Sequence, residues 1–345
     1  MRLGVGSLRL LSFNAWLIGL NVAIFVLGIL LSGRGVPVLI ERSIEPSTPQ
    51  KAKLVILDQM LTTGGQPVAP GTPIPSSGYF RRPILVEGTN QIVGTALYQM
   101  MDPLTAFGHF STYQGFQRVE VWRLVTFQFL HANFAHLLLN MLGLYFFGGT
   151  VERNLGFKKY AAFYLVCGIF GGLAYLLLNV LGNVLPFQIP GLLFHATMMP
   201  LVGASAGVFG VIVACAYLEP RESVQLLFIP IGIPLPWFAY GYVLFSILNL
   251  LSGGKNAGGD AAHVGGAIAG YYFIRHSHLL RDFFDVFTDS RRPQGQRGRG
   301  GVGVDTEREI DRILAKVRAT GADSLTGAER RTLQSATARG RGADA

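Results

Sequence analysis

The residues best suited to chemistry in this chain surround a serine that lies between small side chains. Gly203-Ala204-Ser205-Ala206-Gly207 has the G-x-S-x-G pattern that carries the nucleophile of the α/β-hydrolases. That pattern indicates a nucleophile when it lies between a strand and an amphipathic helix of a soluble sheet. Residues 201–218 instead contain no charged side chain, which excludes an α/β-hydrolase and predicts a membrane-spanning helix with Ser205 one turn inside it. The Gly203 and Gly207 pair is also typical of closely packed transmembrane helices, so a purely structural role stays open.

A second group of polar side chains lies at the start of the apolar run 134–149. It consists of His131, His136 and Asn140. His136 and Asn140 are four residues apart, so on a helix they share a face and direct their donors to one point. Polar side chains inside a membrane are costly, which makes each of them a candidate functional residue. His131 and His136 are five apart without the acidic neighbour of H-E-x-x-H, and we expect no metal site and no cofactor.

A third group lies at the start of the apolar run 261–274. His263 is preceded by Asp260 and followed by Gly266 and Gly270. The glycines allow a neighbouring helix to approach closely. Asp260 has two interpretations: it orients His263, or it is a solvated loop residue beside glycines, which is the commoner case.

Together these groups contain the parts of an acyl-transfer site. A serine hydroxyl is a weak nucleophile until a base such as His263 takes its proton. The developing oxyanion needs donors, which Asn140, His136 and the Ser205 backbone amide can supply. Phe209, one turn after Ser205, is placed either to pack on the His263 ring or to serve as an ordinary lipid-facing or core aromatic.

The elements that must position these residues are membrane helices. Half of the 345 residues are hydrophobic and 14% are charged, with a positive mean hydropathy, which predicts an integral membrane protein. Cys167 and Cys215 lie inside apolar runs and indicate neither a disulfide nor a zinc site. Six uncharged runs predict an all-α, six-transmembrane-helix protein, at 13–31, 134–149, 160–181, 201–218, 236–251 and 261–274.

The distribution of cations predicts the orientation of these helices. Lys and Arg follow the second, fourth and sixth runs, whereas the loop 183–200 after the third run has no charge. By the positive-inside rule both termini are cytoplasmic. The second, fourth and sixth spans then all run from outside to inside, which puts Ser205, His136 and His263 in one layer near the outer face.

The first apolar run has two interpretations, an uncleaved transmembrane helix or a signal peptide, and we favour the helix because its apolar core is long. The segment that follows is rich in proline and glycine, including Pro67–Pro75, and predicts short helices or strands near the outer interface. Prolines 230, 234 and 236 predict that residues 224–233 approach the membrane without crossing it as one straight helix.

Beyond the last run the chain is polar and basic. The glycine- and arginine-rich residues after 290 are typical of either an RNA-binding segment or a lipid-attracted linker, and we favour the linker and expect no nucleic-acid partner. Ile310, Ile313, Leu314 and Val317 recur at helical spacing, Gly321 supplies a stop, and Thr326-Gly-Ala-Glu329 reads as a capping box. The sequence thus predicts a small cytoplasmic helical hairpin for docking or self-association.

These observations divide the chain into five predicted parts. They are a cytoplasmic N-terminus with the first helix (1–32), a long extracytoplasmic loop (33–130), transmembrane helices two to six (131–280), a basic linker (281–304) and the helical hairpin with its tail (305–345).

Several spaced motifs, in order, resemble the rhomboid intramembrane serine proteases. Glu120-Val-Trp122-Arg123 is similar to the Trp-Arg motif of that family, His131 to Asn140 to its His-x4-His-x3-Asn pattern, Gly203-Ala-Ser205 to its Gly-x-Ser nucleophile, and Ala262-His263 with Gly266 and Gly270 to its sixth helix. The resemblance implies a Ser205/His263 dyad without an acid and an oxyanion site from His136 and Asn140. It implies structural roles near the site for His131, Phe209, Gly203, Trp122, Arg123, Gly266 and Gly270. Ala206, where glycine is common, and the long first loop depart from the pattern.

The sequence therefore predicts a multi-pass serine endopeptidase that cleaves transmembrane segments of membrane proteins near the outer face of a bacterial cytoplasmic (inner) membrane. Its partners are transmembrane substrates and the lipid bilayer, and its oligomeric state stays open. The alternative is a rhomboid-like protein that binds membrane clients without cleaving them. Such relatives typically lack the serine or the histidine, and both are present here.

Overall fold

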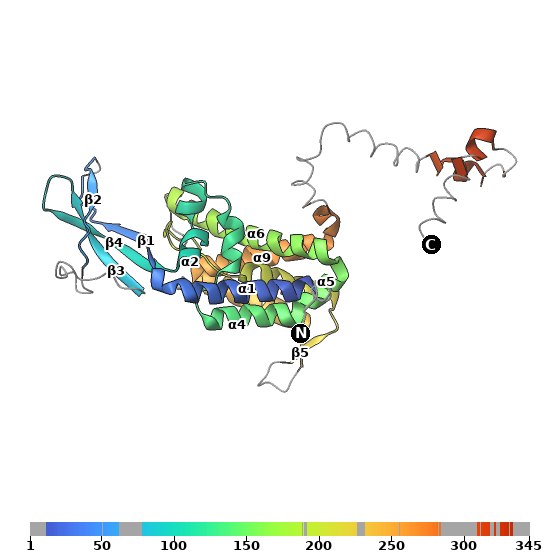
Figure 1. Ribbon diagram of the computed structural model, residues 1–345, viewed down its shortest axis with the longest axis horizontal. Coiled ribbons are helices and arrows are strands. Elements are labelled where there is room, and N and C mark those ends of the chain that lie inside the picture. Colours follow the sequence, from blue (N-terminus) through green and yellow to red (C-terminus); the bar gives the residue numbers. More distant parts are fainter. Residues whose placement is uncertain are drawn as a thin grey trace, which may run out of the picture. The chain divides into compact units, whose positions relative to one another are not determined.

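The computed structural model describes residues 12–49, 51–61, 78–187, 189, 192–225, 232–254, 256–281 and 283, and the shorter pieces 309–310, 312–317, 321, 325–330 and 332–333. The chain forms two compact units, residues 1–281 and residues 282–345. The first unit is a helical bundle with a β-sheet inserted after its first helix (Figure 1). The N-terminal Arg2 and Arg9, the segment Pro67–Pro75 and nearly all of the predicted basic linker lie outside the described residues.

Three helical stretches in the described residues are long and apolar enough to cross a membrane. They are α1 (Phe13–Leu31) with the short turn η2 (Ser32–Arg34), the continuous stretch of α4 (Phe134–Gly143), η5 (Leu144–Gly148) and α5 (Gly149–Leu155), and α6 (Phe157–Val184). The helices α7 (Ser205–Leu218) and α8 (Leu235–Leu251) are apolar but shorter. The bundle also contains α9 (Ala257–Arg275) and the turn η6 (Ser277–Leu280). The prediction of a membrane protein with transmembrane helices is confirmed.

Polar groups of η5, α5 and α6 hold the start of helix α1. The backbone N–H groups of Phe13 and Asn14 donate to the Glu152 carboxylate at 2.7 and 2.9 Å. The Asn14 side chain donates to the Leu144 carbonyl, where the π-helical turn η5 begins, and accepts from the Tyr160 hydroxyl, both at 2.8 Å. These bonds satisfy helix-terminal donors that have no partner within α1, and an acidic group at a helix N-terminus is electrostatically favourable.

Helices α7 and α9 pack closely through glycine. A Cβ at Gly266 would overlap the Ala206 carbonyl, and one at Gly270 would overlap the Gly210 backbone. This close approach places the start of α7 beside the second and third turns of α9.

Residues before α7 are extended, and this corrects one sequence prediction. Leu201 pairs with Phe110 as an isolated antiparallel bridge, and the Gly203 N–H donates to the Phe127 carbonyl at 2.9 Å. Gly203 has φ of +134°, a value that other residues rarely adopt. The prediction that Ser205 lies one turn inside its helix is therefore wrong: Ser205 is the first residue of α7. Hydropathy could not detect the boundary, since residues 201–204 before the helix are as uncharged as the helix itself.

The prediction of an all-α protein is wrong for residues 36–101. Four antiparallel strands form a sheet in the order β1-β4-β3-β2, with β1 (Val36–Ile44), β2 (Leu54–Ile56), β3 (Gly78–Val86) and β4 (Ile92–Met101). Ile84, Val93 and Ala96 form its buried cluster. Neither β3 nor β4 alternates apolar and polar side chains, so a period of two could not separate strand from helix in the sequence. The prediction of short helices or strands for the long first loop is met by strands in residues 36–101, which Figure 1 shows as arrows apart from the helices, and by short helices after them.

The sheet leads directly into a compact segment that precedes α4. Asp102 caps α2 (Pro103–Gly108) by accepting from the Leu104 and Thr105 N–H groups. There follow the π-helical turn η3 (Thr112–Gln117), α3 (Arg123–Thr126) and η4 (Phe127–Phe129). Through the Phe110–Leu201 bridge and the bond from Gly203 to Phe127, this segment fixes the chain just before Ser205.

The proline-rich stretch before α8 contains a small strand pair. β5 (Ser223–Gln225) pairs with β6 (Gly232–Pro234), and residues 226–231 between them, including Pro230, lie outside the described residues. Pro236 stands in the first turn of α8, where a missing N–H costs no helical bond.

In the second unit the described residues contain short helical pieces. Gly321 has φ of +82°, and its N–H donates to the Val317 carbonyl at 2.9 Å, as a helix stop requires. The Glu329 carboxylate accepts from the Thr326 N–H, and the Glu329 N–H donates to the Thr326 hydroxyl, which is the predicted capping box. Lys316 donates to the same carboxylate and thereby links the two helical pieces. That these pieces form a cytoplasmic hairpin for docking or self-association stays a prediction.

Candidate active site

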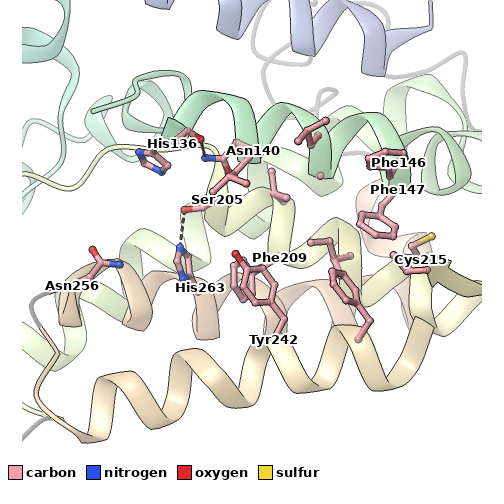
Figure 2. Close-up of a pocket in the computed structure, with 18 of the residues that line it drawn as sticks. His136, Asn140, Phe146, Phe147, Ser205, Phe209, Cys215, Tyr242, Asn256 and His263 are labelled. Atoms are coloured by element: carbon pink, nitrogen blue, oxygen red, sulfur yellow. Dashed lines mark hydrogen bonds between the residues drawn. The ribbon is translucent and has the colours of Figure 1, made fainter. Parts of the chain in front are cut away.

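Ser205 and His263 meet where α7 and α9 pack together. The Ser205 Oγ lies 2.9 Å from the His263 Nε2, as the dashed line in Figure 2 marks. Ser205 begins α7 and His263 lies in the second turn of α9, and the close packing of these helices brings the two side chains together. A hydroxyl and an imidazole nitrogen at this distance can share a proton, which is the geometry of a nucleophile and its base.

An aromatic stack holds the histidine ring. Phe209 lies parallel to His263, with centroids 4.3 Å apart and an interplanar angle of 8°. Tyr242 of α8 stacks against Phe209, with centroids 4.4 Å apart. Figure 2 shows Phe209 and Tyr242 side by side next to His263. Sequence reasoning reached Phe209 but missed Tyr242, because nothing in the spacing along the chain connects the fifth apolar run to Ser205.

The other ring nitrogen of His263 faces Asp260, for which the sequence left two interpretations open, and Ser246, which sequence reasoning missed. The His263 Nδ1 lies 3.3 Å from the Ser246 Oγ and 3.7 Å from the Asp260 Oδ1. Asp260 is 3% exposed, and its other oxygen accepts from the Asn249 amide. The interpretation of Asp260 as a solvated loop residue is therefore wrong. α9 begins at Ala257, so Asp260 lies one turn before His263 on the same helix face.

His136 and Asn140 line the same cavity as Ser205 and His263. A Cβ on Gly203 would lie 2.7 Å from the His136 Cε1 and 3.4 Å from the Ser205 Oγ, so the His136 ring packs on Gly203 beside the serine. The Asn140 amide donates to the His136 carbonyl at 2.8 Å, which leaves one of its two N–H groups for another acceptor. Asn133 caps α4 by accepting from the His136 N–H.

His131 lies just before α4 and is buried against His136. The two rings meet edge to face, with centroids 5.2 Å apart. Burial, together with the charge that His136 would carry, lowers the pKa of His131 to about 3. His131 is therefore neutral near pH 7 and packs behind the residue that faces Ser205.

Trp122 and Arg123 contact the segment before α4 rather than the reacting groups. The Arg123 side chain is buried, pairs with Glu120 at 2.6 Å and donates to the His109 carbonyl at 2.7 Å. The Trp122 ring stacks on Phe107, with centroids 5.8 Å apart. Both residues hold α2 and α3 together, which is the segment that fixes the chain before Ser205.

The cavity extends well beyond the serine. Its volume is about 1350 Å³, and it runs along one face of α7 between α4, η5 and α8. Apolar side chains such as Leu139, Phe146, Ile212 and Phe238 line most of it, so an apolar helix or an extended peptide fits its chemistry. Among the described residues, no three His, Cys, Asp or Glu side chains come together as a metal site would require. The expectation of a metal-free mechanism stays a prediction.

Comparison with known proteins gives one family. Residues 118–277 match the family described as the Rhomboid domain. RHOMBOID-like protein 12, mitochondrial, of Arabidopsis thaliana is 31% identical over 155 residues, which cover 44% of this chain and 45% of that protein. Rhomboid protease GlpG of Yersinia pestis (strain Pestoides F) is 27% identical over 186 residues, which cover 53% and 54% of the two chains. The matched region thus spans about half the length of each of these curated relatives.

Proposed function

This chain carries a rhomboid domain, and from that premise we propose that it is an intramembrane serine endopeptidase. Membership of this family supports intramembrane protease activity in general, and one relative is named a rhomboid protease. The observation that carries the proposal for this chain is the contact of 2.9 Å between the Ser205 Oγ and the His263 Nε2.

The geometry supports acyl transfer through a covalent intermediate. His263 takes the Ser205 proton at Nε2 while Oγ bonds to the carbonyl carbon of the substrate peptide. When the tetrahedral intermediate collapses, the C–N bond breaks and His263 gives the proton to the leaving amine. Water then attacks the acyl-enzyme and gives one proton to His263. The second collapse releases the carboxylic product and returns that proton to Ser205.

The start of α7 supplies donors for the oxyanion. The first N–H groups of a helix have no partner inside the helix, and its dipole favours negative charge at this end. Since Ser205 is the first residue of α7, its own N–H lies beside the reacting oxygen. His136 and the free N–H of Asn140 line the cavity next to Ser205 and complete the proposed oxyanion site.

We place this site in a bundle of six spans with both termini in the cytoplasm. The arginine and lysine residues after the second, fourth and sixth apolar runs support this orientation. Ser205 and His136 begin their helices and His263 lies in the second turn of α9, so the site lies near the extracytoplasmic face. We propose a bacterial cytoplasmic membrane because several similar proteins come from Yersinia. The substrates are transmembrane segments whose backbone unwinds near that face, because the peptide carbonyls of an intact helix are already hydrogen-bonded.

Cleavage of a reporter transmembrane substrate in liposomes tests the proposal. Wild-type protein is expected to release the product, while Ser205→Ala and His263→Ala release none above background. Folding of each variant is checked by its thermal unfolding midpoint. Substrate binding without cleavage by folded wild-type protein would contradict the protease and favour the non-catalytic client-binding role.

A further inference from the structure

A carboxylate lies behind the proposed base, where the sequence resemblance implied a dyad without an acid. We propose that Asp260 is a positioning residue that orients His263 through its Nδ1, with Ser246 as the second acceptor. This inference rests on the proposed function, because it assigns a role in the same serine chemistry. Three side chains from two helices carry it: Ser246 and Asn249 of α8 and Asp260 of α9.

The tautomer of His263 decides which of its ring nitrogens can act as a base. To accept a proton from Ser205 at Nε2, the neutral ring must carry its hydrogen on Nδ1. The Asp260 Oδ1 lies 3.7 Å from Nδ1 and the Ser246 Oγ 3.3 Å from it. Both oxygens accept hydrogen bonds, so this environment favours the tautomer that leaves Nε2 free to act as a base.

Asp260 is held by Asn249 and by its own place in the first turn of α9. The Asn249 amide donates to the Asp260 Oδ2, so one carboxylate oxygen is fixed and the other is directed to His263. Asp260 lies in the first turn of α9, where the helix dipole favours a negative charge. Its backbone N–H donates to the Asn256 carbonyl at 2.9 Å, which fixes the turn itself. A buried carboxylate with an assigned partner on each oxygen has a defined orientation.

The Asp260 carboxylate also faces the positive charge that develops on His263 during the reaction. When His263 takes the Ser205 proton, the ring becomes an imidazolium, and the Asp260 carboxylate attracts its Nδ1–H. Asp260 exchanges no proton and touches no substrate atom, so it acts only through His263. The other titratable groups that face this pair are His136 from α4, Tyr242 from α8 and Tyr175 from α6, which packs on Gly258 of the first turn of α9.

The kinetic test compares Asp260→Asn with Ser252→Ala in the liposome assay. Ser252 is an exposed residue at the end of α8 whose hydroxyl donates to the Asn249 carbonyl, and it serves as the control. Asp260→Asn is expected to lower kcat by about 10- to 100-fold, the usual effect of losing a group that orients a functional histidine, with KM changed less than about twofold. The acid limb of the kcat profile is expected to move to lower pH, because the ring loses a carboxylate that stabilises its protonated form.

A purely structural role for Asp260 predicts a different result. Asp260→Asn would then lower the thermal unfolding midpoint and the fraction of active enzyme, but the acid limb of the kcat profile would stay at the same pH. That outcome would overturn the proposal. An Asp260→Asn variant with kcat within twofold of wild type and an unmoved limb would overturn it as well.

A spectroscopic test separates this inference from the proposed protease activity. The ¹⁵N chemical shifts of His263, assigned by their loss in His263→Gln, report which ring nitrogen carries the hydrogen. The Nδ1–H tautomer is expected in wild type, with a mixture of tautomers in Asp260→Asn. The opposite tautomer in wild type, or no change in the variant, would contradict the role of Asp260 even in an active protease. A wild-type protein that shows the expected tautomer but cleaves no substrate would instead contradict the proposed function alone.

Discussion

Ser205 and His263 are 58 positions apart in the sequence, yet their reacting atoms lie within hydrogen-bond distance. Residue types and hydropathy were sufficient to select this pair, because a polar side chain in an apolar run needs a reason to be there. Phe209, His136 and Asn140 around the pair were also reached from the sequence, but the contributions of α8 were not. Tyr242, Ser246 and Asn249 come from α8 and contact α7 and α9 only through the fold.

The aromatic stack gives a prediction for a single side chain. Tyr242→Leu removes the ring that packs on Phe209, so the His263 ring is less restrained. We expect the rate constant for fluorophosphonate labelling of Ser205 to fall by about three- to tenfold, which corresponds to the roughly 0.5–1.5 kcal/mol of an aromatic pair. Trp237→Leu, on the same helix at a site that is 77% exposed, is the control and should label at the wild-type rate. Equal rates for the two variants would show that the stack does not restrain the base.

Two buried histidines outside the membrane spans make the stability of the folded protein depend on pH. Burial lowers the pKa of His131 to about 3 and also lowers that of His109, whereas both return to about 6.5 on unfolding. Below pH 6.5 the unfolded state binds protons that the folded state does not, so stability is full above pH 6.5 and is lost as the pH falls toward 3. For His131 the loss between pH 6.5 and 5 is about 2 kcal/mol.

The measurement is the thermal unfolding midpoint in detergent from pH 7.5 to pH 5. Wild-type protein should lose stability steadily, and His131→Gln should lose clearly less because one of the two groups is gone. A midpoint that rises on acidification, or identical slopes for the two proteins, would contradict the assignment of His131 as a neutral buried residue.

At the scale of the elements, the sequence located helices better than their ends or their neighbours. α1 has the predicted bounds, because an uncharged run between polar flanks defines a membrane helix by itself. The start of α7 was misplaced, since an extended chain paired with Phe110 carries the same apolar residues as a helix. The four-stranded sheet was missed as a fold because register depends on pairing between strands that are distant in sequence.

Close packing between α7 and α9 gives a prediction at this scale. A methyl group at Gly270 would overlap the Gly210 backbone, so Gly270→Ala must push the two helices apart and separate Ser205 from His263. We expect the free energy of unfolding to fall by about 1–3 kcal/mol and cleavage to fall at least tenfold. Gly19→Ala is the matched control, because a Cβ there meets no atom within 4 Å. Unchanged stability and cleavage in Gly270→Ala would show that this contact does not set the geometry of the site.

At the scale of the whole molecule, segments from many parts of the first unit position the residues of the site. Glu120 and Arg123 fix the segment before α4, that segment pairs with the chain before Ser205, and α6, α7 and α9 pack through small residues. The sheet of residues 36–101 and the helical pieces after residue 309 are additions to this frame. The composition of the sequence was enough to divide the chain into these parts. It does not show what the sheet and the C-terminal helical pieces bind.

The central claim is that Ser205 is a nucleophile activated by His263, and labelling by a fluorophosphonate followed by peptide mapping tests it most directly. The reagent needs no native substrate, so the result does not depend on the choice of reporter. We expect a single modified site at Ser205, no modification in Ser205→Ala, and labelling at least about 100-fold slower in His263→Ala, the scale of general-base catalysis. Modification at another residue, or equal labelling of folded wild-type and His263→Ala protein, would contradict the account.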